Sequence, residues 1–179
     1  RWGNCSAPHG GVVDAAWNES AVILSRTQIA GLGAFQHVRQ PAVGGCMHLA
    51  QDVAAWLSSV HLRDCFADTA GAIHAHSSAR LSLVQSKIED SGCSDSMCTG
   101  GGVWAHSRAQ VIALHSSIRG CSALTAEGTG GCIAIGTDTV LELAHSSVSS
   151  GSALVSGGCI AATSRQAVVK MFNTSVTEC

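Results

Sequence analysis

Apolar residues recur along this chain in pairs separated by one residue, a spacing that predicts short β-strands with one inward face. A pair of small residues precedes the first strand of each unit, near positions 10, 44, 70, 101, 130 and 157. These units are 26 to 34 residues apart, which is a period typical of repeat proteins. The pattern therefore predicts one repeat architecture over residues 1–179.

Each unit contains three such strands, and equivalent positions can be aligned as columns. The first strand gives Val13, Met47, Ile73, Trp104, Ile133 and Ile160, followed two residues later by Ala15, Leu49, Ala75, His106, Ile135 and Ala162. The second gives Val22, Ala55, Leu81, Val111, Leu141 and Val169, followed by Leu24, Leu57, Leu83, Ala113, Leu143 and Met171. The third gives Ile29, Leu62, Ile88, Ile118, Val148 and Val176. We expect these columns to be buried by stacking and the corners 136–138 and 145–147 to be exposed.

Three strands per unit, joined by corners, predict an all-β parallel β-helix, or solenoid, of about six turns. The segments GGCIAIGTDTVLELAHSSVSSGSALVSGGCIAA and KMFNTSVTEC resemble right-handed parallel β-helix repeats of the pectin-lyase-like superfamily, in particular its surface-protein type with Gly-Gly-x-Ile repeats. The resemblance implies a single right-handed β-helix. It implies little about activity, because the superfamily includes lyases, hydrolases, epimerases, adhesins and structural rods.

The ends of the chain both fall within a unit. Cys5–Ala7 repeats the closing sequence Cys121–Ala123, and Cys179 holds the same closing position. An open solenoid end exposes strand edges and needs a cap, and no cap is recognisable in the sequence. We therefore expect the chain to be a segment of a longer solenoid.

Composition narrows the classes of function. Hydrophobic residues make up 46% of the chain and charged residues 12%, which argues against a disordered segment. A net charge of −2 gives no basic stripe, so we expect no nucleic-acid partner. No apolar run approaches the length that spans a bilayer, so we expect no direct membrane insertion by this segment.

Asparagine and cysteine indicate the compartment. All three asparagines begin an N-x-S/T triplet, which predicts glycosylation at Asn4, Asn18 and Asn173. Nine cysteines are many for a reducing compartment. We therefore predict an extracellular or cell-surface location. The alternative is that Cys and Ser only fill tight solenoid positions.

The cysteines occupy two recurrent places and are disulfide candidates. Cys46, Cys132 and Cys159 follow the small-residue pair, Cys65, Cys121 and Cys179 close a unit, and Cys93 and Cys98 flank an apparent insertion. Stacked strands lie about 4.8 Å apart, so neighbouring units could be joined by Cys132–Cys159 or Cys65–Cys93. Alternatively, Cys121–Cys132 would close one corner and Cys93–Cys98 would close one loop. The sequence does not choose among these pairs. No C-x₂-C pair supports a zinc site.

Nine histidines raise the question of a metal or catalytic site. His48 and His74 share an outward column with Asp14, His115 and His145 share a corner column, and His106 falls on an inward column beside Trp104. Imidazoles one unit apart can hold a divalent ion, but solenoids also stack like residues for packing alone. We favour packing, and predict neither a metal nor another cofactor.

Catalytic motifs of β-helix enzymes are not recognisable. The aspartates are scattered over corners, without the carboxylate cluster that a lyase needs for Ca²⁺ or the Gly-His-Gly element of a polygalacturonase-like site. The sequence thus favours a non-catalytic structural or interaction module that binds other protein chains or glycans of an extracellular assembly. Two alternatives stay open: a carbohydrate-binding or polysaccharide-processing domain, and a spacer within a larger surface or membrane complex.

Two segments between units look like insertions, Ala30–Val43 and Ser91–Gly100. Insertions in solenoids form loops that often carry function. Within the first segment, Phe35, His37 and Arg39 are the candidates for contact with a partner.

Overall fold

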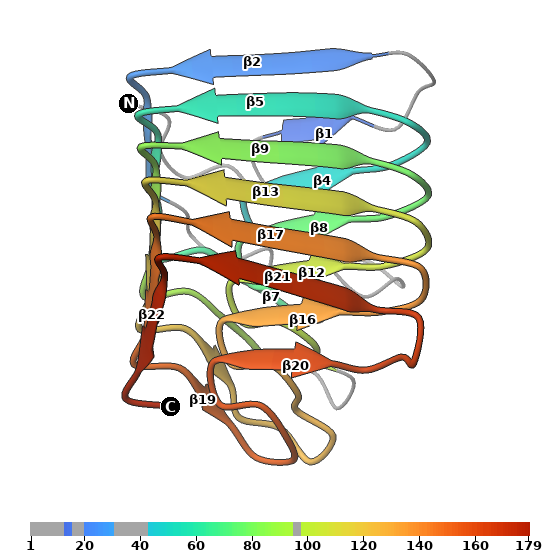
Figure 1. Cartoon of the computed structure of the whole chain (residues 1–179), viewed down its shortest axis with the longest axis vertical. Coiled ribbons are helices and arrows are strands. Elements are labelled where there is room, and N and C mark those ends of the chain that lie inside the picture. The colour runs from blue at the N-terminus through green and yellow to red at the C-terminus, as the bar shows by residue number, and fades with distance from the viewer. Residues whose placement is uncertain (1–12, 16–19, 31–42, 95–97) are drawn as a thin grey trace.

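In a computed structural model of the chain, the alternating apolar pairs form short strands that stack along one axis (Figure 1). The structure describes residues 13–15, 20–30, 43–94 and 98–179. It is an all-β parallel solenoid, which confirms the predicted fold class. The solenoid has about five turns rather than six, because a sheet of six successive strands requires the chain to go round only five times. No helix long and apolar enough to cross a membrane occurs in the described residues.

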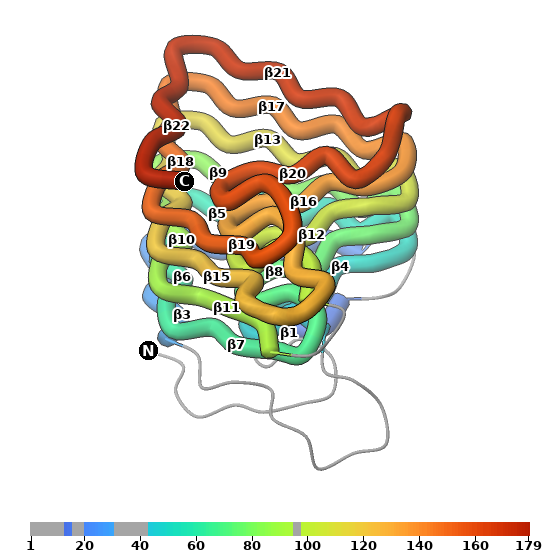
Figure 2. The backbone as a smooth tube through the Cα atoms, turned by 90° about the horizontal axis from the view of Figure 1, so that it is seen from below, coloured from blue at the N-terminus to red at the C-terminus, as the bar shows by residue number. Residues whose placement is uncertain are grey.

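Four parallel sheets form the walls (Figure 2). Sheet 1 contains β1 (Val13–Ala15), β4 (Met47–Leu49), β8 (Ile73–Ala75), β12 (Val103–Ala105), β16 (Ile133–Ile135) and β20 (Ile160–Ala162). Sheet 2 contains β2 (Ala21–Ser25), β5 (Ala54–Ser58), β9 (Arg80–Val84), β13 (Gln110–Leu114), β17 (Val140–Ala144) and β21 (Val168–Phe172). Sheet 3 contains β3 (Gln28–Ala30), β6 (His61–Arg63), β10 (Lys87–Glu89), β14 (Ser117–Arg119), β18 (Ser147–Ser149) and β22 (Ser175–Thr177). Sheet 4 contains β7 (Phe66–Ala67), β11 (Gly92–Cys93), β15 (Ser122–Ala123) and β19 (Ser152–Ala153).

The core lies between sheets 1, 2 and 3, and strand alternation explains it. In β17, Leu141 and Leu143 point inward and are almost fully buried, whereas Glu142 between them is partly exposed. Leu141 pairs in register with Val111 and Val169. The columns predicted for the second and third strands therefore match the observed pairing throughout.

One first-strand prediction was wrong by a single residue. Val103 and Ala105 of β12 face the core and are fully buried, so Trp104 lies in the outward column and His106 lies beyond the strand. The run of three glycines at 100–102 left the register ambiguous, and a slip of one residue exchanges the two faces of a strand. The backbone of Gly100 resolves this ambiguity. Its φ of 74° matches the positive φ of Gly44 and Gly130, so Gly100 is the first glycine of the pair in its rung.

Corners between sheets 2 and 3 follow one rule in every rung. A single residue at each corner adopts φ between 46° and 54°: Arg26, Ser59, Gln85, His115, His145 and Asn173. The next residue is then turned inward, and Ser116 hydrogen-bonds the Leu114 carbonyl oxygen at 2.9 Å and receives the Ser86 N–H at 3.1 Å. A column of hydroxyls at Ser86, Ser116, Ser146 and Thr174 satisfies backbone groups that the corner would otherwise leave unpaired.

Thr137, Asp138 and His145 are exposed as predicted at their corners, but burial differs from expectation at Gly136, at Ser146 and in the last rung. Ser146 is buried because its hydroxyl belongs to that column, and Gly136 is buried against the Cβ atom of His106. In the last rung, Met171 is 56% exposed and Val176 is 40% exposed, although both occupy inward columns. Among the described residues nothing stacks on their outer side, so these columns are not covered there.

The described residues of the segment Ser91–Gly100 belong to the regular rung rather than to an insertion. Gly92 pairs with Phe66 and Ser122 on the neighbouring rungs, and Thr99 forms a bridge with Thr129. Ile73, Val103 and Ile133 are paired and lie 30 residues apart, so the central rungs have one length. The apparent insertion arose because Gly92–Cys93 form β11 of sheet 4, whose short strands carry little hydrophobic pattern.

Candidate functional site

The histidines of the first wall gather into a cluster. Asp14, His48 and His74 occupy successive rungs of the outward column of sheet 1, as the sequence predicted. His76 and His106 each follow the end of a strand of the same sheet, β8 and β12. We call His48, His74, His76 and His106, together with Asp14, the histidine cluster.

Ring nitrogens meet in pairs within the histidine cluster. The Nε2 atoms of His48 and His76 are 3.0 Å apart, and those of His74 and His106 are also 3.0 Å apart. In each pair one ring donates its N–H and the other accepts. The pairing runs across neighbouring rungs, so the parallel register of sheet 1 brings these nitrogens together.

Polar groups hold the opposite side of three of the rings. The Nδ1 atom of His48 lies 2.8 Å from the Oδ1 atom of Asp14. The Nδ1 atoms of His76 and His106 each lie 2.8 Å from the hydroxyl of the following serine, Ser77 and Ser107. These contacts fix the ring orientations and direct Nε2 of each ring into the cluster.

The cluster is sheltered from solvent by its own ring stacking. His48 and His74 are 8% and 6% exposed although they face outward. The Trp104 indole stacks on His74 with ring centroids 4.8 Å apart and lies 4.3 Å from the ring of His106. Burial lowers the pKa of His106, which favours its neutral form. Neutral imidazole is the form that binds metal ions.

Three of these rings can reach a common point. His48, His74 and His76 each offer a ring nitrogen, and these three atoms lie within 4.8 Å of one another. The sequence revealed two members of this set through their shared column. It missed His76 and misplaced His106 on the inward face, because both lie beyond the strands, where the period of two no longer indicates direction.

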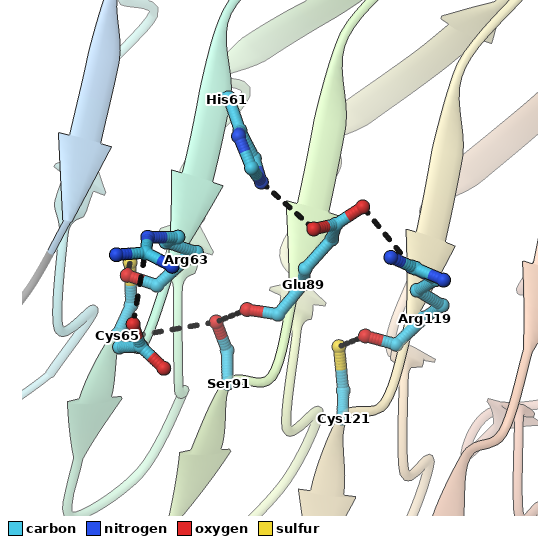
Figure 3. Close-up of polar contacts among 8 residues, drawn as sticks. His61, Arg63, Cys65, Glu89, Ser91, Arg119 and Cys121 are labelled. Carbon is cyan, nitrogen blue, oxygen red and sulfur yellow. Dashed lines mark hydrogen bonds and ion pairs between the residues drawn. The ribbon is translucent and has the colours of Figure 1, made fainter.

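A second polar cluster crosses sheet 3 (Figure 3). The buried carboxylate of Glu89 on β10 accepts a hydrogen bond from Arg119 Nε at 3.0 Å and lies 2.9 Å from His61 Nε2. Burial acts to raise the pKa of Glu89, but the hydrogen bonds from Arg119 and His61 and their charges outweigh it, so the pKa is lowered. This carboxylate is therefore a paired structural group and is poorly suited to accept a proton in catalysis.

A polar groove of about 760 Å³ follows the corners between sheets 2 and 3. The His115 and His145 rings stack along it with centroids 5.0 Å apart, and the side-chain nitrogen of Asn173 is 2.9 Å from His145 Nδ1. The lining also includes serine hydroxyls, Gln85, Lys87, Met171 and Thr174. The groove thus offers hydrogen-bond donors and acceptors on an open wall.

Three disulfides form among the described residues, and two of them join pairs that the sequence did not suggest. Two bonds, Cys46–Cys65 and Cys159–Cys179, each join the cysteine that follows the small-residue pair to the cysteine that closes the same rung. The third bond links Cys93 to Cys98. The pairs Cys132–Cys159 and Cys65–Cys93 between neighbouring rungs do not form, because Cys65, Cys93 and Cys159 bond elsewhere. Cys93–Cys98 was one of the alternatives.

Cys121 and Cys132 are buried free thiols in contact with each other. In the rungs closed by Cys46–Cys65 and Cys159–Cys179, the position opposite each cysteine holds a second cysteine. At the equivalent positions, Cys121 lies beside Gly102 and Cys132 lies beside Gly151. The hydrogen bond with Cys132, together with burial, raises the pKa of Cys121 well above its usual value. Burial and this hydrogen bond therefore favour the protonated form of the Cys121 thiol.

The remaining predicted site residues are only partly within the described chain. Asn173 is exposed at its corner. Asn4, Asn18, Phe35, His37 and Arg39 lie outside the described residues, so their predicted roles remain predictions.

Comparison of the chain with protein-family models, with curated proteins and with solved structures finds no match. The parallel solenoid is established by the structure itself.

Proposed function

We propose that this chain is a non-catalytic structural and interaction module of a secreted or cell-surface glycoprotein. The observation that carries the proposal is a continuous parallel stack with disulfides that close individual rungs. Each rung rests on its neighbours along one axis, which makes a stiff spacer. Disulfides persist in oxidising compartments, which supports an extracellular location.

The outer face of sheet 2 supports a role in assembly. Ile23 is 72% exposed, Trp56 is 49% exposed and Phe172 is 67% exposed, and all three lie on this wall. Ile23 and Trp56 pair in register on adjacent strands, and contiguous exposed apolar side chains are typical of surfaces that bind other proteins. The partners in this proposal are other chains or glycans of an extracellular assembly.

Two finer statements belong to the same proposal. The repeats are those of the surface-protein type of the pectin-lyase-like superfamily, which accords with their parallel stacking. Asn173 carries a glycan, since it is exposed at a corner and begins an N-x-S/T triplet. Intact-mass measurement of the secreted protein before and after enzymatic deglycosylation tests the second statement.

The experiment that tests the spacer role removes residues 73–132 from the full-length protein in its native cells. Ile73 and Ile133 occupy the same register position, so the cut removes two whole rungs and joins Ala72 to Ile133. We expect display at the cell surface to persist while the maximum dimension in solution scattering falls by about 10 Å. A control deletion of residues 73–117 breaks the register and should prevent secretion. A protein that occurs only in the reducing cytosol, with all thiols free, would contradict the proposal.

A second candidate function, glycan binding, is favoured by the groove between sheets 2 and 3. Its hydroxyl, amide and imidazole groups suit the hydroxyls of a sugar chain. Titration with a panel of oligosaccharides tests it. We expect the double variant Ser117→Ala/Ser147→Ala, which keeps the buried hydroxyl column intact, to weaken any binding at this groove. Undiminished binding in that variant would exclude the groove.

A further inference from the structure

We propose that His48, His74 and His76 form a binding site for a divalent transition-metal ion, with Asp14 as an outer-shell partner of His48. This site goes beyond the spacer role, which needs no metal. It rests on the convergence of three ring nitrogens within 4.8 Å of one another. All three rings are supplied by sheet 1 and by the residues that directly follow its strands.

The distances suit coordination. A zinc–imidazole bond is about 2.0–2.1 Å, so two ligands in a tetrahedral site are about 3.3 Å apart. His48 Nε2 and His76 Nε2 are already 3.0 Å apart. The widest separation in the set must narrow by about 1.5 Å to reach the same geometry, a change within the range of small side-chain rotations.

A metal ion can replace the proton shared by His48 and His76 without breaking the contacts of these two rings with Asp14 and Ser77. In the metal-free cluster, His48 donates Nδ1–H to Asp14 and its Nε2 accepts the Nε2–H of His76. His76 Nδ1 then accepts from the Ser77 hydroxyl. When a metal ion takes the place of that proton, His76 changes tautomer without net proton release: its ring loses the proton at Nε2 to solvent and gains one at Nδ1, which it then donates to the Ser77 hydroxyl. Both Nε2 lone pairs then face the metal.

The outer contacts match those of metal-binding histidines. Such histidines almost always donate their second N–H to a carboxylate or another polar group, which fixes the tautomer and raises the basicity of the ligand. Asp14 supplies a carboxylate at 2.8 Å from His48, and Ser77 supplies a hydroxyl at 2.8 Å from His76. Packing alone would stack the rings but would not require these polar contacts.

The ligand chemistry selects the ion. Three neutral imidazoles without a coordinating thiolate suit Zn²⁺, Cu²⁺ and Ni²⁺ rather than Ca²⁺ or Mg²⁺, which prefer oxygen. Trp104 shields one side of the cluster and leaves the ion in a dry environment that strengthens the bonds. A solvent molecule or His106, whose Nε2 is 3.0 Å from that of His74, would complete four-coordination.

Titration of the metal-stripped chain with ZnCl₂, followed by calorimetry, tests the site. We expect saturable binding of one equivalent, absent from the double variant His48→Gln/His76→Gln. Asp14→Asn should bind the same amount about 10- to 100-fold more weakly. The double variant His115→Gln/His145→Gln is the matched control, since these rings are also stacked one rung apart but have no third histidine beside them among the described residues.

The thermal unfolding of each metal-free variant shows whether it still folds. Substitution with Co²⁺ gives a second readout, a visible spectrum typical of nitrogen coordination in the wild-type chain and none in the His48/His76 variant. Equal zinc affinity in the wild-type chain and a folded His48/His76 variant would overturn the proposal. Loss of binding in the His115/His145 control would overturn it as well.

Discussion

Glu89 and Arg119 lie in register on adjacent rungs, and the Arg119 guanidinium donates to a carboxylate that is itself buried. The arginine side chain is 57% exposed whereas that of Glu89 is 10% exposed. The wall of the solenoid therefore holds a desolvated negative charge that depends on partners from both neighbouring rungs, Arg119 on one side and His61 on the other.

The first prediction concerns acid stability. The pKa of Glu89 in the folded chain is below its ordinary value of 4.5, so the unfolded chain binds more protons. Its contribution is complete above about pH 4.5 and is lost as the pH falls through the folded pKa. We expect Glu89→Gln to be less stable than wild type at neutral pH, with the difference shrinking towards about pH 2. Denaturant melts across this range measure it.

A matched control for acid stability is Glu142→Gln. Glu142 pairs with Lys170 at 2.7 Å, but the Lys170 side chain is well exposed and that of Glu142 is partly exposed, so solvent screens the pair. We expect little change in stability for this variant. Equal effects of the two substitutions would show that burial of Glu89 is irrelevant.

The second prediction compares two residues of one inward column. Leu143 is 2% exposed and Met171, its partner on the last rung, is 56% exposed. Leu143→Ala should cost about 2–5 kcal/mol of unfolding free energy because it opens a cavity. Met171→Ala should cost less than about 1 kcal/mol, since little of it is buried. Equal losses in urea unfolding would contradict the burial described here.

The third prediction concerns the column of hydroxyls at the corners. Ser116 is buried, donates to backbone carbonyl oxygens and accepts from the Ser86 amide. Ser116→Ala leaves these groups unpaired and should cost about 1–3 kcal/mol. Ser117→Ala is the control, because its hydroxyl has a partner in the Ser147 hydroxyl, 3.2 Å away, and Ser117 is only partly buried. Chemical denaturation of the two variants should separate them clearly.

The fourth prediction concerns the disulfides. Cys46 and Cys65 are 19 residues apart and Cys93 and Cys98 only 5. Loop-closure entropy therefore predicts a loss of about 3 kcal/mol for Cys46→Ala/Cys65→Ala and about 2 kcal/mol for Cys93→Ala/Cys98→Ala. Peptide mapping without reduction should recover both bonds. A bond from Cys65 to Cys93 in that map would refute the assigned pairing.

The repeat architecture could be predicted because hydrophobic alternation in strands carries direct information about which face is buried. Leu83, Ala113 and Leu143 align in sequence and in the structure for this reason. The glycine run before Val103 carries no such information, and the register was misjudged there by one residue. Sheet 4 escaped notice because its strands contain only two residues each.

The candidate metal site could be predicted only in part. His48 and His74 share a column that is visible in the sequence. His76 joins them because the chain bends after β8, and the direction of a side chain at a bend depends on backbone dihedral angles rather than on periodicity. The disulfides that close a rung were missed for a similar reason: the chain returns to the same wall about 20 residues later, a closeness that only the shape of the rung reveals.

The constant 30-residue register between Ile73, Val103 and Ile133 has a consequence for inheritance. Unequal recombination between two such gene segments adds or deletes coding sequence for an intact rung, and the resulting protein keeps its pairing on both sides of the junction. The length of the solenoid can thus change by whole rungs through the number of repeats alone, without compensating point mutations.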